Sequence, residues 1–205
     1  MEYIMRITGL HEFVEFAAED LVGVTESGLQ SVFLANNDES VFLNFSEPVY
    51  GQTIKSPIET FIKRNNGPGV QHLALITNDI FKTLREMKKT SLFDFMPPPE
   101  GDYYQKLKAV ASGFLTEEEI QECEALGLKV DKDHEGVIIQ TFTKPIGDRL
   151  TIFIEVIQRI GCMIQGEDGK FYQKGGCGGF GNGKNFNELV KSLEKYERTI
   201  ITTQS

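Results

Sequence analysis

The chain has 205 residues, of which 40% are hydrophobic and 25% charged, and it carries a formal net charge of −9. This composition is typical of one ordinary globular domain, and the acidic balance excludes the basic surface that nucleic acids and anionic membranes require. No apolar run approaches the roughly 18 to 20 positions of a membrane-spanning helix. Because the first residues, MEYIMR, resemble neither a secretory signal nor a transit peptide, we expect a cytoplasmic protein.

Three cysteines, at positions 123, 162 and 177, are odd in number and form no Cys-x-x-Cys pair. Such a set lacks both the even count of a disulfide framework and the spacing of a zinc site. We therefore expect reduced thiols.

The first third of the chain predicts a helix and then a β-hairpin. Hydrophobic residues recur every three or four positions over 3–18, which is typical of an amphipathic helix. Residues 28–49 contain two strand-like runs around the turn-rich segment 36–39, which predicts a hairpin. A short helix is predicted over 56–64, and the Asn/Gly/Pro run at 65–69 predicts the turn that ends it.

The middle of the chain predicts a strand followed by helices. Residues 70–76 are strand-like, and Asn78-Asp79 can cap a helix that follows them. A short strand over 93–96 is expected to stop at three prolines. Thr116 and Glu119 have the spacing of a capping box for a helix that ends at Gly127.

The last third predicts two strands, a loop and a helix. The strand-like segments 137–143 and 151–158, joined by a short turn, should pair antiparallel. A glycine-rich loop over 175–183 precedes a final amphipathic helix, and the tail beyond Arg198 is expected to fray.

Three predicted strands each aim one polar side chain among apolar ones: His72, Gln140 and Glu155. Each alone has a structural explanation, namely a core histidine, a structural hydrogen bond and an ion pair with an arginine or lysine. Together they are typical of a small barrel whose interior is a ligand site. A histidine nitrogen and a carboxylate oxygen suit Fe(II), provided that a second histidine completes the set.

The other motifs give weaker evidence of function. The G-x-G-x-x-G pattern at 176–181 follows a polar stretch, which argues against dinucleotide binding, and Gly183-Lys184 lacks the P-loop spacing. His11 in the first predicted helix and His134 in a polar turn are expected to be exposed.

Several long blocks resemble a known family. They are GVQHLAL at 69–75, QTFTKP at 140–145, Asp148-Arg149, TIFIEVIQR at 151–159 and GGFG at 178–181. On these residues, nearly the whole chain resembles the C-terminal, catalytic half of 4-hydroxyphenylpyruvate dioxygenases, a family of the vicinal oxygen chelate superfamily. The insert at 161–179 is similar to that of the plant-type members.

The resemblance implies an α+β fold, a half-open glyoxalase-like barrel built from paired βαβββ modules, the first of which lacks its opening strand. Residues 1–66 would form the truncated first module and residues 67–160 the second. A glycine-rich loop would follow at 161–183, and a C-terminal lid helix at 184–198.

The resemblance also implies an Fe(II) enzyme of tyrosine catabolism that converts 4-hydroxyphenylpyruvate and O₂ to homogentisate and CO₂. His72 and Glu155 would bind iron, and Gln140 would orient the substrate. The aromatic rings of Phe142 and Phe186 would wall the pocket. Ser31 falls where the family has a serine near the substrate phenol. Relatives of full length are typically oligomeric, which leaves a homo-oligomer open for this chain.

The chain also departs from the family. The family's first iron histidine lies upstream of the segment matching Tyr3, and Pro57 and Ser46 replace a glutamine and an asparagine usual near the substrate. These departures keep two other interpretations open. One is an inactive remnant that acts as a binding or dimerisation module, and the other is a 4-hydroxymandelate synthase-like activity.

Overall fold

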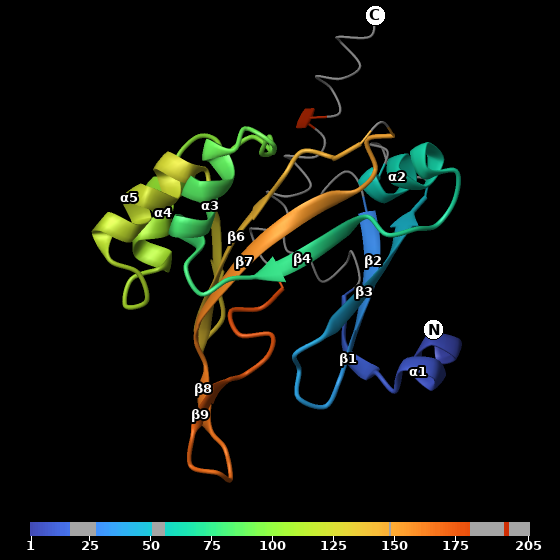
Figure 1. Cartoon of the computed structure of the whole chain (residues 1–205), viewed down its shortest axis with the longest axis horizontal. Helices are drawn as coiled ribbons and strands as arrows, with labels where there is room; N and C mark the ends of the chain where they lie inside the picture. The colour runs from blue at the N-terminus through green and yellow to red at the C-terminus, as the bar shows by residue number, and fades with distance from the viewer. Residues whose placement is uncertain (17–27, 51–55, 148, 181–194, 197–205) are drawn as a thin grey trace, which may run out of the picture.

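The computed structural model describes residues 1–16, 28–50, 56–147, 149–180 and 195–196. Figure 1 shows two larger sheets side by side, with three helices against the outer side of one of them and a narrow hairpin below it. The predicted lid helix at 184–198 lies almost wholly outside the described residues. No described helix is long and apolar enough to cross a membrane.

The first sheet is a three-stranded antiparallel sheet with the order β1-β2-β3, as Figure 1 shows. It confirms the predicted hairpin, whose strands are β2 and β3. The elements of this part are α1 (Glu2–Thr8), β1 (His11–Phe16), β2 (Gly28–Ala35), β3 (Phe42–Val49) and α2 (Pro57–Asn65). Ser56 caps α2 through its side chain, so the predicted short helix is confirmed as well.

The single helix expected over 3–18 is wrong beyond Thr8. Gly9 adopts a left-handed conformation with φ 73° and closes α1, and the chain continues as β1. A glycine reaches this conformation without steric cost, so the helix ends there despite the helical spacing of the following apolar residues. His11 is exposed, as expected, but on a strand and not on a helix.

The second sheet has four strands in the order β4-β7-β6-β5. Strand β6 pairs antiparallel with β7, as the sequence predicted. Strand β4 pairs parallel with β7. The elements are β4 (His72–Ile76), α3 (Ile80–Lys89), α4 (Tyr103–Val110), α5 (Glu117–Leu126), β5 (Lys129–Lys132), β6 (Gly136–Phe142) and β7 (Phe153–Gly161). The predicted caps of α3, at Asp79, and of α5, a capping box at Thr116 and Glu119, are confirmed.

Some elements were not predicted. Helix α4, strand β5 and the hairpin of β8 (Met163–Gln165) and β9 (Phe171–Gln173) are found in addition. The strand expected over 93–96 is reduced to a single bridge between Phe95 and Thr143. Among the described residues, the first sheet has three strands and the second has four.

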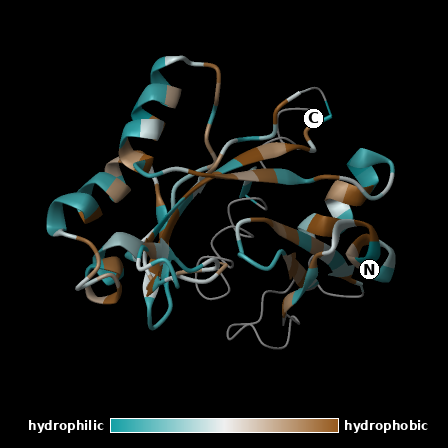
Figure 2. Cartoon of the chain, turned by 60° about the horizontal axis from the view of Figure 1, so that its bottom comes forward, coloured by the Kyte–Doolittle hydropathy of each residue, from teal (hydrophilic) through white to brown (hydrophobic). Residues whose placement is uncertain are grey.

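The period of two along each strand gives the second sheet two different faces. One face packs against α3, α4 and α5 and forms the main core, with Val130, Val137, Ile139 and Val156 among its buried members. Figure 2 shows hydrophobic residues along these strands, while the helices alternate between hydrophobic and hydrophilic positions. The opposite face carries the intervening residues of the same strands, among them Lys129, Gln140 and Glu155.

Cys162 and Cys177 form a disulfide, so the expectation of three reduced thiols is wrong; only Cys123 is free. The β8–β9 hairpin turns the chain back on itself and brings the two α-carbons to 5.7 Å from each other. Gly178 follows with φ 76°, and a Cβ there would lie 2.3 Å from the backbone of Val137 and Ile138. The 175–180 segment is therefore packed closely onto β6.

Phe180 ends this segment and connects the two sheets. Its ring centroid lies 4.5 Å from that of Phe33 and 5.1 Å from that of Phe42, both on the first sheet. On the second sheet, the guanidinium carbon of Arg159 lies 5.3 Å from the same ring. The disulfide thus holds a segment that contacts both sheets.

Reduction of this disulfide should destabilise the protein. The bond closes a loop of 15 residues, and the entropy model gives such a loop about 3 kcal/mol of stabilisation. We expect dithiothreitol to lower the free energy of unfolding in urea by about this amount, and to leave Cys162→Ser unaffected. One thiol should react with iodoacetamide in the denatured, unreduced protein and three after reduction; three before reduction would contradict the bond.

Candidate functional site

The register of the second sheet places His72, Gln140 and Glu155 on the face that points away from the helices, which we call the open face. Glu155 lies opposite Phe142 on β6 and opposite Ala74 on β4. His72 lies two positions from Ala74, and Gln140 lies two positions from Phe142, so both share the face of Glu155. The structure therefore brings together the three polar residues that the sequence singled out.

His72 and Glu155 form the centre of this face. The Nε2 atom of His72 lies 3.5 Å from Oε2 of Glu155, and the side chains are 24% and 9% exposed. The His72 ring stacks on Phe153 at 5.0 Å, and its Nδ1 lies 3.2 Å from Oε1 of Gln71. Two neighbours therefore fix the orientation of the ring with Nε2 toward the carboxylate.

His72 is the least exposed residue of β4, although the sequence placed it among apolar neighbours. Leu73 and Leu75 are 50% and 55% exposed, because β4 is an edge strand. The histidine is instead covered by its contacts with β7. All other residues of β4 are exposed, on both faces of the strand.

Burial shifts the pKa of His72 and that of Glu155 in the directions that favour the neutral form of each group. It lowers the pKa of His72 to about 4, so the ring is neutral at pH 7. It raises the pKa of Glu155 to about 8, although the charges of Arg159 and Lys129 act in the opposite direction. The imidazole and the carboxyl lie 3.5 Å apart, and a cation bound between them would stabilise the carboxylate form of Glu155 while the imidazole stays neutral.

Arg159 shares the open face through its position on β7, but its guanidinium has other partners. Its Nη1 donates to the carbonyl of Cys177 and, at 2.6 Å, to that of Gly179. Glu155 thus contacts the neutral ring of His72, and the charge of Arg159 also acts on it. Arg159 chiefly anchors the segment that follows the disulfide.

Gln140 and Phe142 lie on β6 and are 4% and 2% exposed. Phe142 packs edge-on against Phe153 at 6.0 Å. Phe186, the other aromatic residue expected at the pocket, lies outside the described residues.

Lys129 on β5 was missed by the sequence analysis. It pairs in register with Gln140, is 1% exposed, and places its Nζ 5.5 Å from the ring centroid of Phe142. The only available signal was its alternation with the core residue Val130 in a short strand, and a lysine at such a position usually faces solvent.

Ser31 lies on the first sheet, directly opposite Ser46 on β3. The hydroxyl oxygens of the two residues are 2.6 Å apart and share a hydrogen bond. Ser31 is 4% exposed. Ser31 and Ser46 thus form one hydrogen-bonded pair across the hairpin.

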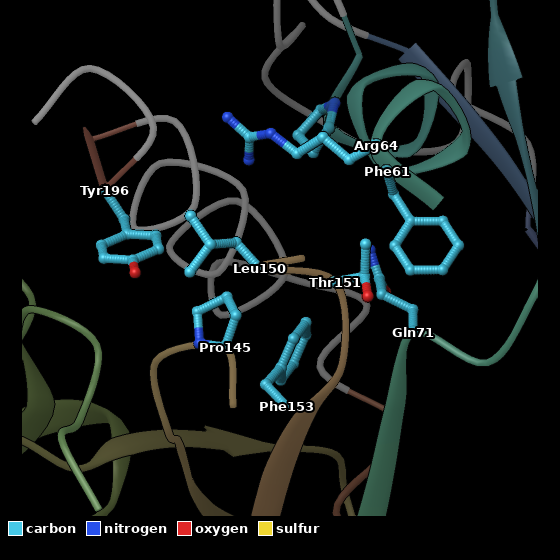
Figure 3. A pocket seen from close by; sticks show the side chains of 9 residues that line it. Phe61, Arg64, Gln71, Pro145, Leu150, Thr151, Phe153 and Tyr196 are labelled. Atoms are coloured by element: carbon cyan, nitrogen blue, oxygen red, sulfur yellow. The ribbon is translucent and has the colours of Figure 1, made fainter. Parts of the chain in front are cut away.

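A pocket opens at the N-terminal end of β4 (Figure 3). Gln71 and Phe153, which both contact His72, form part of its wall, and Phe61 of α2 lies next to Gln71 (Figure 3). Pro57 occupies the first turn of α2 in the same wall. The remaining lining residues are Arg64, Pro145, Leu150, Thr151 and Tyr196.

The donor set fits a divalent cation in part. A neutral imidazole nitrogen and a carboxylate oxygen are common ligands of first-row metals, and here they converge on one side of a sheet. Among the residues that the structure describes, no third histidine, cysteine, aspartate or glutamate joins them. The site therefore offers two protein ligands.

Comparison with solved structures defines the class of fold. The chain superimposes on a mutant of 4-hydroxymandelate synthase from Streptomyces coelicolor with a TM-score of 0.75 and 26% sequence identity, over 96% of this chain and 49% of that one. A fusion protein of a xylose isomerase-like TIM barrel and 4-hydroxyphenylpyruvate dioxygenase gives a TM-score of 0.60 at 21% identity. These neighbours place the chain in the vicinal oxygen chelate fold.

Comparison with curated proteins narrows this class. The chain is 58% identical to the 4-hydroxyphenylpyruvate dioxygenase of Plectranthus scutellarioides, over 98% of this chain and 46% of the relative. It is 55% identical to that of Arabidopsis thaliana, over 100% of this chain and 46% of the relative, and 36% identical to that of Sus scrofa. No family model matches. The chain is thus a homologue of the plant 4-hydroxyphenylpyruvate dioxygenases and spans about half the length of the curated relatives it matches.

The raised pKa of Glu155 predicts a pH-dependent stability of the metal-free protein. The folded state keeps a proton on Glu155 between its ordinary pKa of 4.5 and about 8, so stability is fully present below 4.5 and falls as the pH rises toward 8. His72 acts oppositely, because its pKa is lowered from 6.5 to about 4; its contribution grows with pH and is complete above 6.5.

The window from pH 6.5 to 8 therefore isolates Glu155. Across it we expect the wild type to lose about 1 to 2 kcal/mol more stability than Glu155→Gln, measured by urea unfolding in EDTA. Equal losses in the two proteins would contradict the raised pKa.

Proposed function

We propose that the open face of the second sheet is the iron and substrate site of a 4-hydroxyphenylpyruvate dioxygenase. The reaction would convert 4-hydroxyphenylpyruvate, a 2-oxo acid, and O₂ to homogentisate and CO₂. The observation that supports this most is the 3.5 Å approach of His72 to Glu155 beside buried Gln140 and Phe142. The blocks that carry these residues occur in a chain 58% identical to a plant dioxygenase.

His72 and Glu155 would hold Fe(II), which supplies the activation of O₂ when it is bound. With the Gln71 amide oxygen accepting from Nδ1–H, Nε2 keeps a free electron pair for the metal. The neutral state of His72 removes the need to displace a proton from the ring. Glu155 would lose its proton as the cation binds.

The surrounding residues would bind and orient the substrate. Gln140 offers a buried amide on the same face, and Phe142 offers an aromatic wall. Ser31, paired with Ser46, would meet the substrate phenol from the first sheet. Phe186 and the lid helix at 184–198 belong to this proposal on the family resemblance alone.

Residues 1–66 and 67–160 would act as the two modules of the half-open barrel. Phe180, whose ring contacts both sheets, would keep their open faces together. A substrate held between Ser31 and Gln140 requires this approach, because the two residues belong to different modules.

Removing either proposed ligand should abolish metal binding. We expect His72→Ala and Glu155→Ala to lose Co(II) binding measured by calorimetry, while His134→Ala, at an exposed histidine of a turn, keeps it. Co(II) has the charge of Fe(II) and tolerates air. Unchanged binding in either ligand variant would contradict the proposal.

Product analysis tests the reaction itself. With Fe(II), ascorbate and 4-hydroxyphenylpyruvate, we expect homogentisate, and Gln140→Ala should lower its rate of formation on the order of a hundredfold through poorer substrate orientation. Hydroxymandelate as product would instead support the synthase-like activity that the fold comparison also allows.

The exposed edges favour a second candidate, a strand-pairing or dimerisation module. Among the described residues, β3 pairs only with β2, and β4 only with β7. Phe45 on β3 and Leu75 on β4 are 36% and 55% exposed. Unpaired edges with apolar side chains favour pairing with another chain.

Sedimentation would distinguish this second candidate from the first. A dimer that Phe45→Lys dissociates and Leu92→Lys leaves intact, together with no turnover, would favour the module. Leu92 is a suitable control, because it is 77% exposed and lies outside the sheets.

A further inference from the structure

The most unusual buried group of the molecule is a lysine in the site. Lys129 is among the largest fully buried side chains, at 1% exposure, and lysine is almost never buried this deeply. Its neighbour Val130 packs into the core under the helices, so Lys129 occupies the opposite, open face. That face is the one that carries Gln140, Phe142 and Glu155.

Phe142 connects Lys129 to Glu155. The Lys129 Nζ lies 5.5 Å from the centroid of the Phe142 ring, and Phe142 is the register partner of Glu155. Gln140, on the neighbouring strand β6, is the register partner of Lys129. Lys129 therefore lies on the same face as Glu155, one strand beyond Phe142.

We propose that Lys129 acts as an internal counter-charge that competes with a divalent cation for Glu155, so that the site binds the cation weakly while Lys129 is present. This inference rests on the proposed metal site. A dication that enters adds two positive charges near a fixed one in a poorly solvated place, where repulsion between like charges is strong. Lys129 then sets how tightly the site binds the cation.

Proton release does not cancel this effect. If the metal replaces a proton on Glu155, the site still gains one net positive charge, which Lys129 opposes. A negatively charged ligand that enters with the metal reduces the same repulsion. The lysine thereby favours binding of the cation together with an organic anion such as a 2-oxo acid over binding of the cation alone.

The test is a Co(II) titration of the purified full chain and of Lys129→Met, which keeps the length of the side chain and removes its charge. Lys132→Met is the matched control, because Lys132 lies on the same strand and is exposed. We expect Lys129→Met to bind Co(II) tighter by about tenfold or more, and Lys132→Met to match the wild type. Far-ultraviolet circular dichroism and thermal melting establish that each variant is folded.

The outcomes separate this inference from the proposed function. Equal or weaker Co(II) binding by folded Lys129→Met, with binding still lost in Glu155→Ala, overturns the competition and leaves the metal site standing. If Lys129→Met does not fold, Lys129→Gln provides the same comparison with a neutral polar side chain. Absence of binding in the wild type and in both Lys129 variants overturns the inference and the proposed metal site together.

Discussion

The pairing of β4 with β7 is the constraint on which the site depends. Parallel register places His72 beside Phe153 and Ala74 beside Glu155, so the imidazole and the carboxylate face the same side of the sheet. A shift of one residue in β7 would turn Glu155 into the helix-covered core, and the same shift in β4 would turn His72 to the exposed side of that strand. The helices exclude such a shift, because Ile80, Leu84 and Val156 are packed together on that side.

Burial of polar groups on the open face costs free energy, and burial of the apolar side chains on the helix-covered face does not. A carboxyl, an amide and an ammonium group are buried on it with little exposure, and each must be paired or be kept neutral. The structure does so with His72 against Glu155, and with the charges of Arg159 and Lys129 nearby. Such an arrangement is poor for stability alone and suits a site whose charge balance is completed by a ligand.

The sequence predicted the parts of this site that follow from local periodicity. Alternation along 70–76, 137–143 and 151–158 was enough to place His72, Gln140 and Glu155 on inward faces, and the capping box at Thr116 marked a helix start correctly. The convergence of these residues on one face required the strand order, which depends on contacts between distant segments. The family resemblance implied that His72 and Glu155 meet at one site, but it gave no strand order.

Other features depended on tertiary context. The apolar spacing of the first segment is helical throughout, but the segment folds as a helix and a strand. Gly9 ends the helix because it adopts the left-handed conformation. The Cys162–Cys177 bond depended on a hairpin of short strands that no periodicity marked. Burial of Lys129 could not be read from a strand of alternating charge, because only the neighbouring strand β6 makes that side of it an interior.

Anomalous diffraction at the cobalt edge, from crystals grown with Co(II), tests whether His72 and Glu155 bind one and the same cation. We expect a peak within about 2.0 to 2.2 Å of both the His72 Nε2 and a Glu155 oxygen, distances usual for such ligands. A peak bound elsewhere, or a fully ordered site in which Glu155 contacts Lys129 and no metal, would contradict it.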